Sequence, residues 1–123
     1  MPALCIVALG IVQASIATET LSLEWEHSVQ KTRWEERYRV TPDELVLVAA
    51  RVAGSGAGME APPDARFDGS MWSWQPNVHL PELILAASAY TSDYRICTAA
   101  GCAALAALAH GASPVTLRPC STQ

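Results

Sequence analysis

Alternating apolar and polar residues form the clearest pattern in this chain, and the alternation is strongest across residues 20–27 and 30–40. A period of two over such lengths predicts half-buried β-strands. The parity changes between the two segments, which predicts a turn or bulge near residues 28–31. We therefore expect a β-hairpin. In its second strand Trp34, Glu36 and Tyr38 share the side that faces the core.

The rest of the chain also predicts mainly strands. Apolar runs bounded by turn residues indicate strands at 3–9, 11–18, 45–53, 71–75, 82–91, 94–98 and 113–120. The alanine-rich residues 102–110, followed by Gly111, predict one short helix. Residues 62–68 are expected to be irregular surface chain. The pattern predicts a mainly β fold over residues 1–123: a single-domain antiparallel β-sandwich or partly open barrel with one short C-terminal helix.

The first 17 residues have a second interpretation. Their apolar run and the small residues at 14–17 resemble the h-region and cleavage site of a signal peptide. However, no Lys or Arg precedes the run, and Gln13 interrupts it well short of the roughly 20 apolar residues of a spanning helix. We expect a strand pair turning at Gly10, with a leader as the alternative, and no membrane span in this chain.

The amino-acid composition argues against one class of binding partner. The net charge is −4 and the pI is about 5.2, which argues against nucleic-acid binding. Half of the eight basic residues fall on one face of the second hairpin strand: Lys31, Arg33, Arg37 and Arg39. In the register that we expect, Arg37 lies opposite Glu24. This face is therefore expected to carry a cross-strand charge ladder in solvent rather than an anion site.

Four cysteines are present, an even number that permits two disulfides. Cys97 and Cys102 flank a turn-like segment, and Cys5 and Cys120 lie near the two ends of the chain. Two disulfides favour an extracytoplasmic location, although the lack of a clear leader keeps the cytoplasm and four reduced thiols open. The spacings do not match paired zinc knuckles. We expect neither a metal site nor a cofactor.

Glu36 is the residue whose placement most needs an explanation. If Trp25 pairs with Glu36, then His27 pairs with Trp34 and lies diagonal to Glu36, roughly 7–8 Å away. A carboxylate among aromatic rings is costly unless it is paired or hydrogen-bonded. The expected donors are His27, Ser28, Thr32 or backbone amides of the loop 54–59.

The loop Gly54-Ser55-Gly56-Ala57-Gly58-Met59 adds three alternating glycines, which let backbone amides approach a ligand closely. No lysine follows it, so it is not a phosphate loop. The candidate ligand- or partner-binding residues are His27, Ser28, Thr32, Trp34, Glu36, Gly54, Ser55, Gly56, Gly58 and Met59.

Two other interpretations of the same residues remain open. Glu36 and a polar partner could form a core network that fixes strand register. Alternatively, Glu36 could be a general base paired with His27 in a hydrolase-type enzyme. The sequence has no nucleophile elbow and no zincin spacing, so no catalytic residue is assigned.

The residues quoted above, with Cys97, Gly101, Cys102, Leu105 and the terminal strand, resemble the bacterial family of domain of unknown function 1850. Members of that family are often encoded beside TRAP-type transporters of the TAXI class, which take up organic acids. The resemblance implies an extracytoplasmic accessory or binding protein near such a transporter. Its partners would be transporter components or a small carboxylate ligand, and an interaction domain without a ligand is the alternative. The resemblance implies no established activity.

Overall fold

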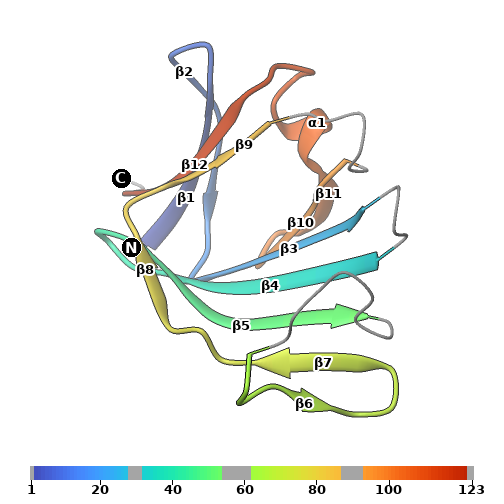
Figure 1. Ribbon diagram of the computed structural model, residues 1–123. Helices are drawn as coiled ribbons and strands as arrows, with labels where there is room; N and C mark the ends of the chain where they lie inside the picture. The colour runs from blue at the N-terminus through green and yellow to red at the C-terminus, as the bar shows by residue number, and fades with distance from the viewer. Residues whose placement is uncertain (1, 28–31, 54–61, 87–92, 122–123) are drawn as a thin grey trace.

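Two antiparallel sheets make up the fold in the computed structural model, which describes residues 2–27, 32–53, 62–86 and 93–121 (Figure 1). The smaller sheet has the order β2-β1-β12-β9 and consists of β1 (Pro2–Ala8), β2 (Ile11–Ala17), β9 (Leu83–Leu85) and β12 (Val115–Ser121). The short helix α1 (Leu105–Leu108) precedes β12.

The larger sheet has eight strands, with the path β11-β10-β3-β4-β5-β7-β6 and β8 also paired to β5. Its strands are β3 (Thr20–His27), β4 (Thr32–Val40), β5 (Leu45–Ala53), β6 (Arg66–Phe67), β7 (Met71–Trp74), β8 (Val78–Leu80), β10 (Arg95–Thr98) and β11 (Gly101–Ala104). The sheets do not close into a barrel, and the predicted mainly β fold with one short helix is confirmed.

The β1–β2 hairpin forms where the sequence predicts a strand pair. Its turn residues Leu9 and Gly10 both have positive φ, 57° and 74°. Two positive φ angles in a two-residue turn match the right-handed twist of the flanking strands. Gly10 supplies this conformation without the steric cost that other residues carry.

The β3–β4 hairpin is present, but its register differs from the expected one by two residues. Trp25 lies opposite Trp34, not Glu36, and His27 lies opposite Thr32. A shift of two keeps every side chain on its predicted face, so alternation alone cannot distinguish the two registers. In the observed register the indole rings of Trp25 and Trp34 stack, and Glu26 lies opposite Arg33.

Several predicted boundaries are wrong in the second half of the chain. The helix covers only Leu105–Leu108, because Gly101–Ala104 pairs with β10 as a strand. Gly101 has a φ of 113°, which turns the chain into that hairpin. The segment expected to be irregular contains the short strand β6. Of the strand expected at 82–91, Leu83–Leu85 is a strand, residues 82 and 86 are not, and residues 87–91 lie outside the described residues.

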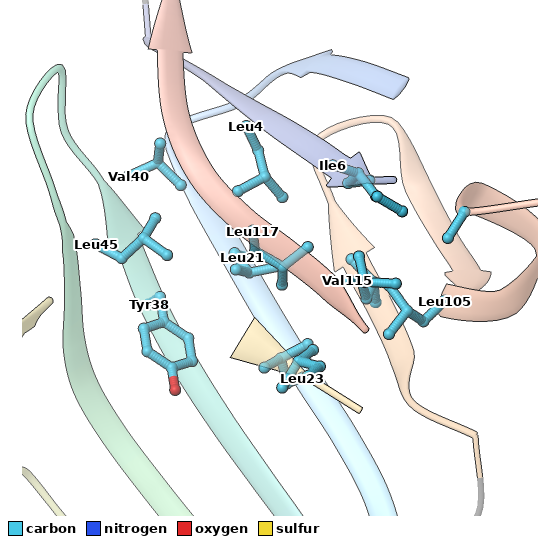
Figure 2. Packing of buried hydrophobic residues seen from close by; sticks show 14 residues of the cluster. Leu4, Ile6, Leu21, Leu23, Tyr38, Val40, Leu45, Leu105, Val115 and Leu117 are labelled. Carbon is cyan, nitrogen blue, oxygen red and sulfur yellow. The ribbon is translucent and has the colours of Figure 1, made fainter. Parts of the chain in front are cut away.

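The hydrophobic core lies between the smaller sheet and part of the larger one (Figure 2). Its buried members come from β1, β3, β4, β5, β9, β10, β12, α1 and the turn after α1: Leu4, Ile6, Ala8, Leu21, Leu23, Tyr38, Val40, Leu45, Leu85, Ile96, Leu105, Ala109, Val115 and Leu117. No described residue of β6 or β7 belongs to this cluster. The core therefore occupies only part of the inner face of the larger sheet.

Both predicted cysteine pairs are at bonding distance. The Sγ atoms are 2.12 Å apart in Cys5–Cys120 and 2.10 Å apart in Cys97–Cys102. Cys5 and Cys120 join β1 to β12, the two central strands of the smaller sheet. Cys97 and Cys102 are direct cross-strand neighbours in the β10–β11 hairpin.

Candidate functional site: an aromatic row beside Glu36

Among the described residues, six aromatic side chains lie on the inner face of the larger sheet beyond the buried core: five align across the sheet, and Trp74 lies opposite Ala50, one pair further along β5. Strand pairing aligns them across the sheet, since Phe67 lies opposite Trp72, both Trp72 and Trp34 lie opposite Val52, and Trp34 lies opposite Trp25. Side chains of directly paired residues point to the same face of a sheet. We call this set the aromatic row: Phe67, Trp72, Trp34, Trp25 and Tyr94.

Ring contacts connect the members of the aromatic row. The rings of Trp25 and Trp34 are stacked, with centroids 6.0 Å apart and planes 4° apart. Tyr94 lies tilted against Trp25 at 5.4 Å, and Phe67 lies tilted against Trp72 at 5.0 Å. Stacked and tilted pairs at these distances are favourable aromatic geometries. The four tryptophan and tyrosine rings of the row are only partly buried, so they combine a fixed arrangement with accessible surface.

Glu36 lies one step further along the strands, between the aromatic row and the core. Its cross-strand neighbours are Leu23 on β3 and Ala50 on β5, and both are buried. The next inward residue on its own strand is the buried Tyr38. Among the described residues that strand pairing places on this face, Glu36 is the one with a carboxylate.

The Tyr38 hydroxyl donates a hydrogen bond of 2.9 Å to Glu36 Oε1. Figure 2 shows the Tyr38 ring beside Leu45, with its hydroxyl pointing away from Val40 and Leu45. This donor was not among the expected ones. Tyr38 is two residues from Glu36 on the same strand and therefore lies on the same face. The sequence pattern identified Tyr38 as a flanking ring and not as a donor.

Burial raises the pKa of the Glu36 carboxyl, and the hydrogen bond from Tyr38 opposes that shift only in part. Burial also raises the pKa of the Tyr38 hydroxyl, and the nearby Glu36 charge raises it further. The same two causes, in the same order, raise the pKa of Tyr94. Glu36 therefore lies within electrostatic range of two tyrosine hydroxyls, in surroundings that favour its neutral form.

The structure brings together only part of the predicted site. Trp34 and Glu36 lie on the predicted face, and strand pairing places Thr32 on that face too. Ser28 and the residues Gly54, Ser55, Gly56, Gly58 and Met59 lie outside the described residues. His27 lies opposite Thr32, whereas Glu36 lies opposite Leu23. Four residues of strand separate these pairs, roughly 13 Å, so the expected diagonal neighbourhood of His27 and Glu36 is wrong.

Sequence reasoning missed five members of the site: Trp25, Tyr38, Phe67, Trp72 and Tyr94. Phe67 fell in the segment that was expected to be irregular surface chain. The alternation placed Trp25 and Tyr38 on the correct face, but it did not give the register of the β3–β4 hairpin. Trp72 was recognised as a ring that could line a pocket, but its alignment with Trp34 depends on the order β4-β5-β7, which periodicity does not encode. Tyr94 precedes β10 and has no alternation of its own to place it.

A family model matches residues 21–105 of the chain, under the description Domain of unknown function (DUF1850). The chain belongs to the DUF1850 family. The matched segment runs from β3 to the first residue of α1, so it contains the whole aromatic row, Glu36 and Tyr38. No curated protein and no solved structure matches the chain. Membership of DUF1850 thus fixes a family without naming an activity.

The outer face of the larger sheet carries the predicted charge ladder, but its ion pairs join different residues from those expected. Arg33 Nη2 lies 3.5 Å from Glu24 Oε2 and 3.4 Å from Glu35 Oε1, and Arg51 Nη1 lies 3.3 Å from Glu35 Oε2. Arg37 lies opposite Ser22, not Glu24, because of the register shift. These partly exposed pairs are worth little individually. A hollow of about 220 Å³ on this face is lined by both signs of charge, including Glu24, Glu35, Arg37 and Arg51.

The inner face offers two kinds of contact to a ligand. The rings provide stacking surface, and the partly buried Glu36, with its raised pKa, lies at the border of the row. Within the described part of this DUF1850 chain, Tyr38 is the hydrogen-bond partner of Glu36, and no three His, Cys, Asp or Glu residues gather as metal ligands. No helix in that part of the chain has the length and apolar character needed to cross a membrane.

Proposed function

We propose that this protein is a small extracytoplasmic binding module that holds a partner group against the aromatic row. The observation that carries the proposal is the alignment of accessible rings across the sheet, with Glu36 beside them. Following the family resemblance, we further propose that the partner is a component of a TRAP-type transporter of the TAXI class. The protein would act there as an accessory subunit.

The position of the aromatic row supports a binding role, because most of its rings lie outside the core. Only Trp25 and Tyr94 of the row pack against the buried cluster, while Trp34, Trp72 and Phe67 do not. Partly exposed tryptophans are costly to leave in water and are enriched where binding energy is concentrated. Rings that are already in contact with each other lose little conformational freedom when a partner covers them.

Charge on the inner face favours a protein segment over a free carboxylate as the partner. No described Lys or Arg is placed on this face by strand pairing, and Glu36 would repel a second carboxylate when ionised. An apolar or aromatic side chain of a transporter component can stack on the row instead. A hydrogen-bond acceptor of that partner would find a donor in protonated Glu36.

Two disulfides support the extracytoplasmic part of the proposal. Such bonds persist mainly in oxidising compartments, and all four cysteines of the chain are paired. The transporter association rests on the resemblance, since the family description itself carries no function. A binding experiment therefore has to test both the surface and the identity of the partner.

The experiment measures binding of the disulfide-intact protein to purified TAXI-class components from one genome: the extracytoplasmic substrate-binding protein and the membrane subunits. We expect one component to bind, and Trp34→Ala to raise its Kd at least tenfold, because an aromatic anchor is removed. Trp34→Phe, which keeps a ring, should recover part of the affinity. Thermal unfolding of each variant shows that the fold persists.

Glu36→Gln has a matched control in Glu35→Gln, since the two residues are adjacent and point to opposite faces. The first substitution should change the affinity or its pH dependence, and the second should leave the Kd within about twofold because Glu35 lies in the outer charge ladder. Absence of binding to every transporter component would end the transporter assignment. If Trp34→Ala leaves the Kd unchanged, the aromatic row is not the binding surface.

A further inference from the structure

The arginines of the larger sheet are confined to its outer face. Strand pairing places all of those that the structure describes on the side of the charge ladder: Arg33, Arg37, Arg39, Arg51, Arg66 and Arg95. The inner face carries the aromatic rings and the Glu36 carboxylate, and the pairing places no described Lys or Arg there. A cationic group that approaches the inner face therefore meets a carboxylate and no arginine or lysine.

Three tryptophans flank Glu36 on the inner face. Trp34 lies two residues away on β4, and Trp74 lies opposite Ala50, the β5 residue that is itself opposite Glu36. Trp72 precedes Trp74 by two residues on β7, so both rings lie two strand spacings from β4, roughly 10 Å. All three rings are partly exposed. Because the face of an aromatic ring attracts cations, the rings and the carboxylate offer a cation two kinds of attraction side by side.

Glu36 has no cationic partner of its own among the described residues. The ion pairs in that part of the chain join other residues, and Tyr38 is the hydrogen-bond donor to Glu36. The Tyr38 bond goes to Oε1, so within the same residues Oε2 accepts no hydrogen bond. Burial raises the pKa of the carboxyl, because its ionised form loses hydration without gaining a counter-ion. A cation from outside the chain would supply that counter-ion.

We propose that the aromatic row binds an arginine side chain of its partner protein, with Glu36 as the counter-ion. The inference rests on the proposed function for the partner's being a protein, and it names the group that the surface takes. Arginine fits better than lysine because its planar guanidinium stacks on indole rings and its N–H fork matches a carboxylate. A guanidinium is also more weakly hydrated than an ammonium, so it leaves water at a lower cost.

Two small probes of nearly equal shape test the inference on the disulfide-intact full chain. They are Nα-acetyl-arginine amide and Nα-acetyl-citrulline amide, in which a neutral urea group replaces the guanidinium. NMR titration of the indole N–H signals, up to about 50 mM probe, gives the Kd of each. We expect the arginine probe to shift the Trp34 signal and to bind at least fivefold more tightly than the citrulline probe, because only the guanidinium is charged. Equal Kd values, or no shift with the arginine probe, overturn the inference.

Glu36→Gln should weaken binding of the arginine probe at least fivefold, whereas Glu35→Gln should leave its Kd within about twofold, because Glu35 lies in the outer charge ladder. Equal effects of the two substitutions overturn the role of Glu36 as the counter-ion. Circular dichroism shows that each variant retains the strand content of the wild type.

The pH dependence of the arginine probe gives a second readout. Its affinity should rise as the pH increases from about 4.5 through the raised pKa of Glu36, because the ionised carboxylate attracts the cation. The described titratable groups near Glu36 are Tyr38 and Tyr94, whose pKa values are raised from 10.0, and its partners on β3 and β5 are apolar. The tyrosines therefore stay protonated in this window. A rise that persists in Glu36→Gln overturns the assignment.

The outcomes separate this inference from the proposed function. If a transporter component binds through Trp34 but the arginine probe binds no better than the citrulline probe, the proposed function stands and the inference fails. If the arginine probe binds selectively and no component binds, the transporter assignment fails and the cation site stands. Nα-acetyl-leucine amide is the third probe. Binding of this probe as tight as that of the arginine probe would show that the row takes an apolar side chain and would overturn the inference.

Discussion

The inner face of the larger sheet has two regions that share strands β3 and β4 and differ in the side chains that they carry. The covered region, with Leu21, Leu23 and Val40, is aliphatic and lies within the buried core. The aromatic row lies further along the strands, where only Trp25 and Tyr94 contact that core. Both regions follow from one alternation pattern. Periodicity thus fixes the face of a side chain but not whether a second layer covers it.

Glu36 marks the border between the two regions. Its neighbours Leu23 and Ala50 are buried, whereas Trp34 on the same strand is partly exposed. An ionised carboxylate among buried apolar residues costs free energy, whereas a carboxylate in water has no such cost. Its raised pKa and the bond from Tyr38 show how the fold accommodates it at this border. The substitutions below separate the two regions by their effects on stability and on binding.

The largest expected effect comes from removing the Cys5–Cys120 crosslink of the smaller sheet, which covers the core. Cys5 and Cys120 are 115 residues apart, so the chain-entropy estimate for the Cys5→Ala and Cys120→Ala double variant is a loss of about 4–5 kcal/mol. The Cys97–Cys102 crosslink spans 5 residues, and its loss should cost about 2 kcal/mol. Urea unfolding under non-reducing conditions measures both, and equal losses would contradict the estimate.

Leu23→Ala is expected to have the next largest effect. Leu23 is fully buried in the core, and deleting a buried leucine side chain typically costs about 2–5 kcal/mol. Trp34→Ala should cost only about 1–2 kcal/mol, since this ring is partly exposed and its main described contact is Trp25. Chemical denaturation of the two variants provides the comparison. A Trp34→Ala loss as large as that of Leu23→Ala would place the aromatic row inside the core.

A smaller, pH-dependent effect is expected for Glu36→Gln. Well below pH 4.5, Glu36 is protonated in both the folded and the unfolded chain, so it contributes no pH dependence. As the pH rises from about 4.5 through the raised pKa, the unfolded chain ionises first and the folded chain retains its proton. The free energy of unfolding therefore falls over this window in the wild type, and less so in Glu36→Gln. Urea unfolding between pH 4 and 8 checks this, with Glu35→Gln as the control.

The smallest expected effect is local and concerns the edge hairpin that presents Phe67 and Trp72. Asp68 Oδ1 accepts hydrogen bonds from the backbone N–H groups of Met71 and Ser70, and these bonds lower the pKa of Asp68 to about 2. Asp68→Ala should loosen this hairpin with little change in global stability. In the wild type the bonds are retained above about pH 3.8 and are lost as pH falls through about 2. Amide exchange at Ser70 and Met71 measures the change.

Much of the fold could be predicted from the sequence, because alternation and turn residues report strand faces and strand ends directly. The β1–β2 and β3–β4 hairpins, the interior strand β5 and both disulfides are confirmed. The predicted helix was too long. Alanines at 103 and 104 have high helix propensity, but they lie in β11, which begins at Gly101 and pairs with β10. Local propensity could not reveal that pairing.

The candidate site was predicted less completely than the fold. Parity placed Trp34 and Glu36 on the correct face, but the choice between registers two residues apart decides whether Glu36 lies near His27 or beside Leu23. Sheet order, which brings Trp72 into line with Trp34, is a tertiary property. The composition of the aromatic row therefore became visible only with the strand pairing.

The most direct test of the central claim is the affinity of Trp34→Ala for the TAXI-class component that binds the wild type, measured beside its free energy of unfolding. The two-region account predicts at least a tenfold loss of affinity with a loss of only about 1–2 kcal/mol in stability. Unchanged affinity, or a stability loss matching that of Leu23→Ala, would contradict it.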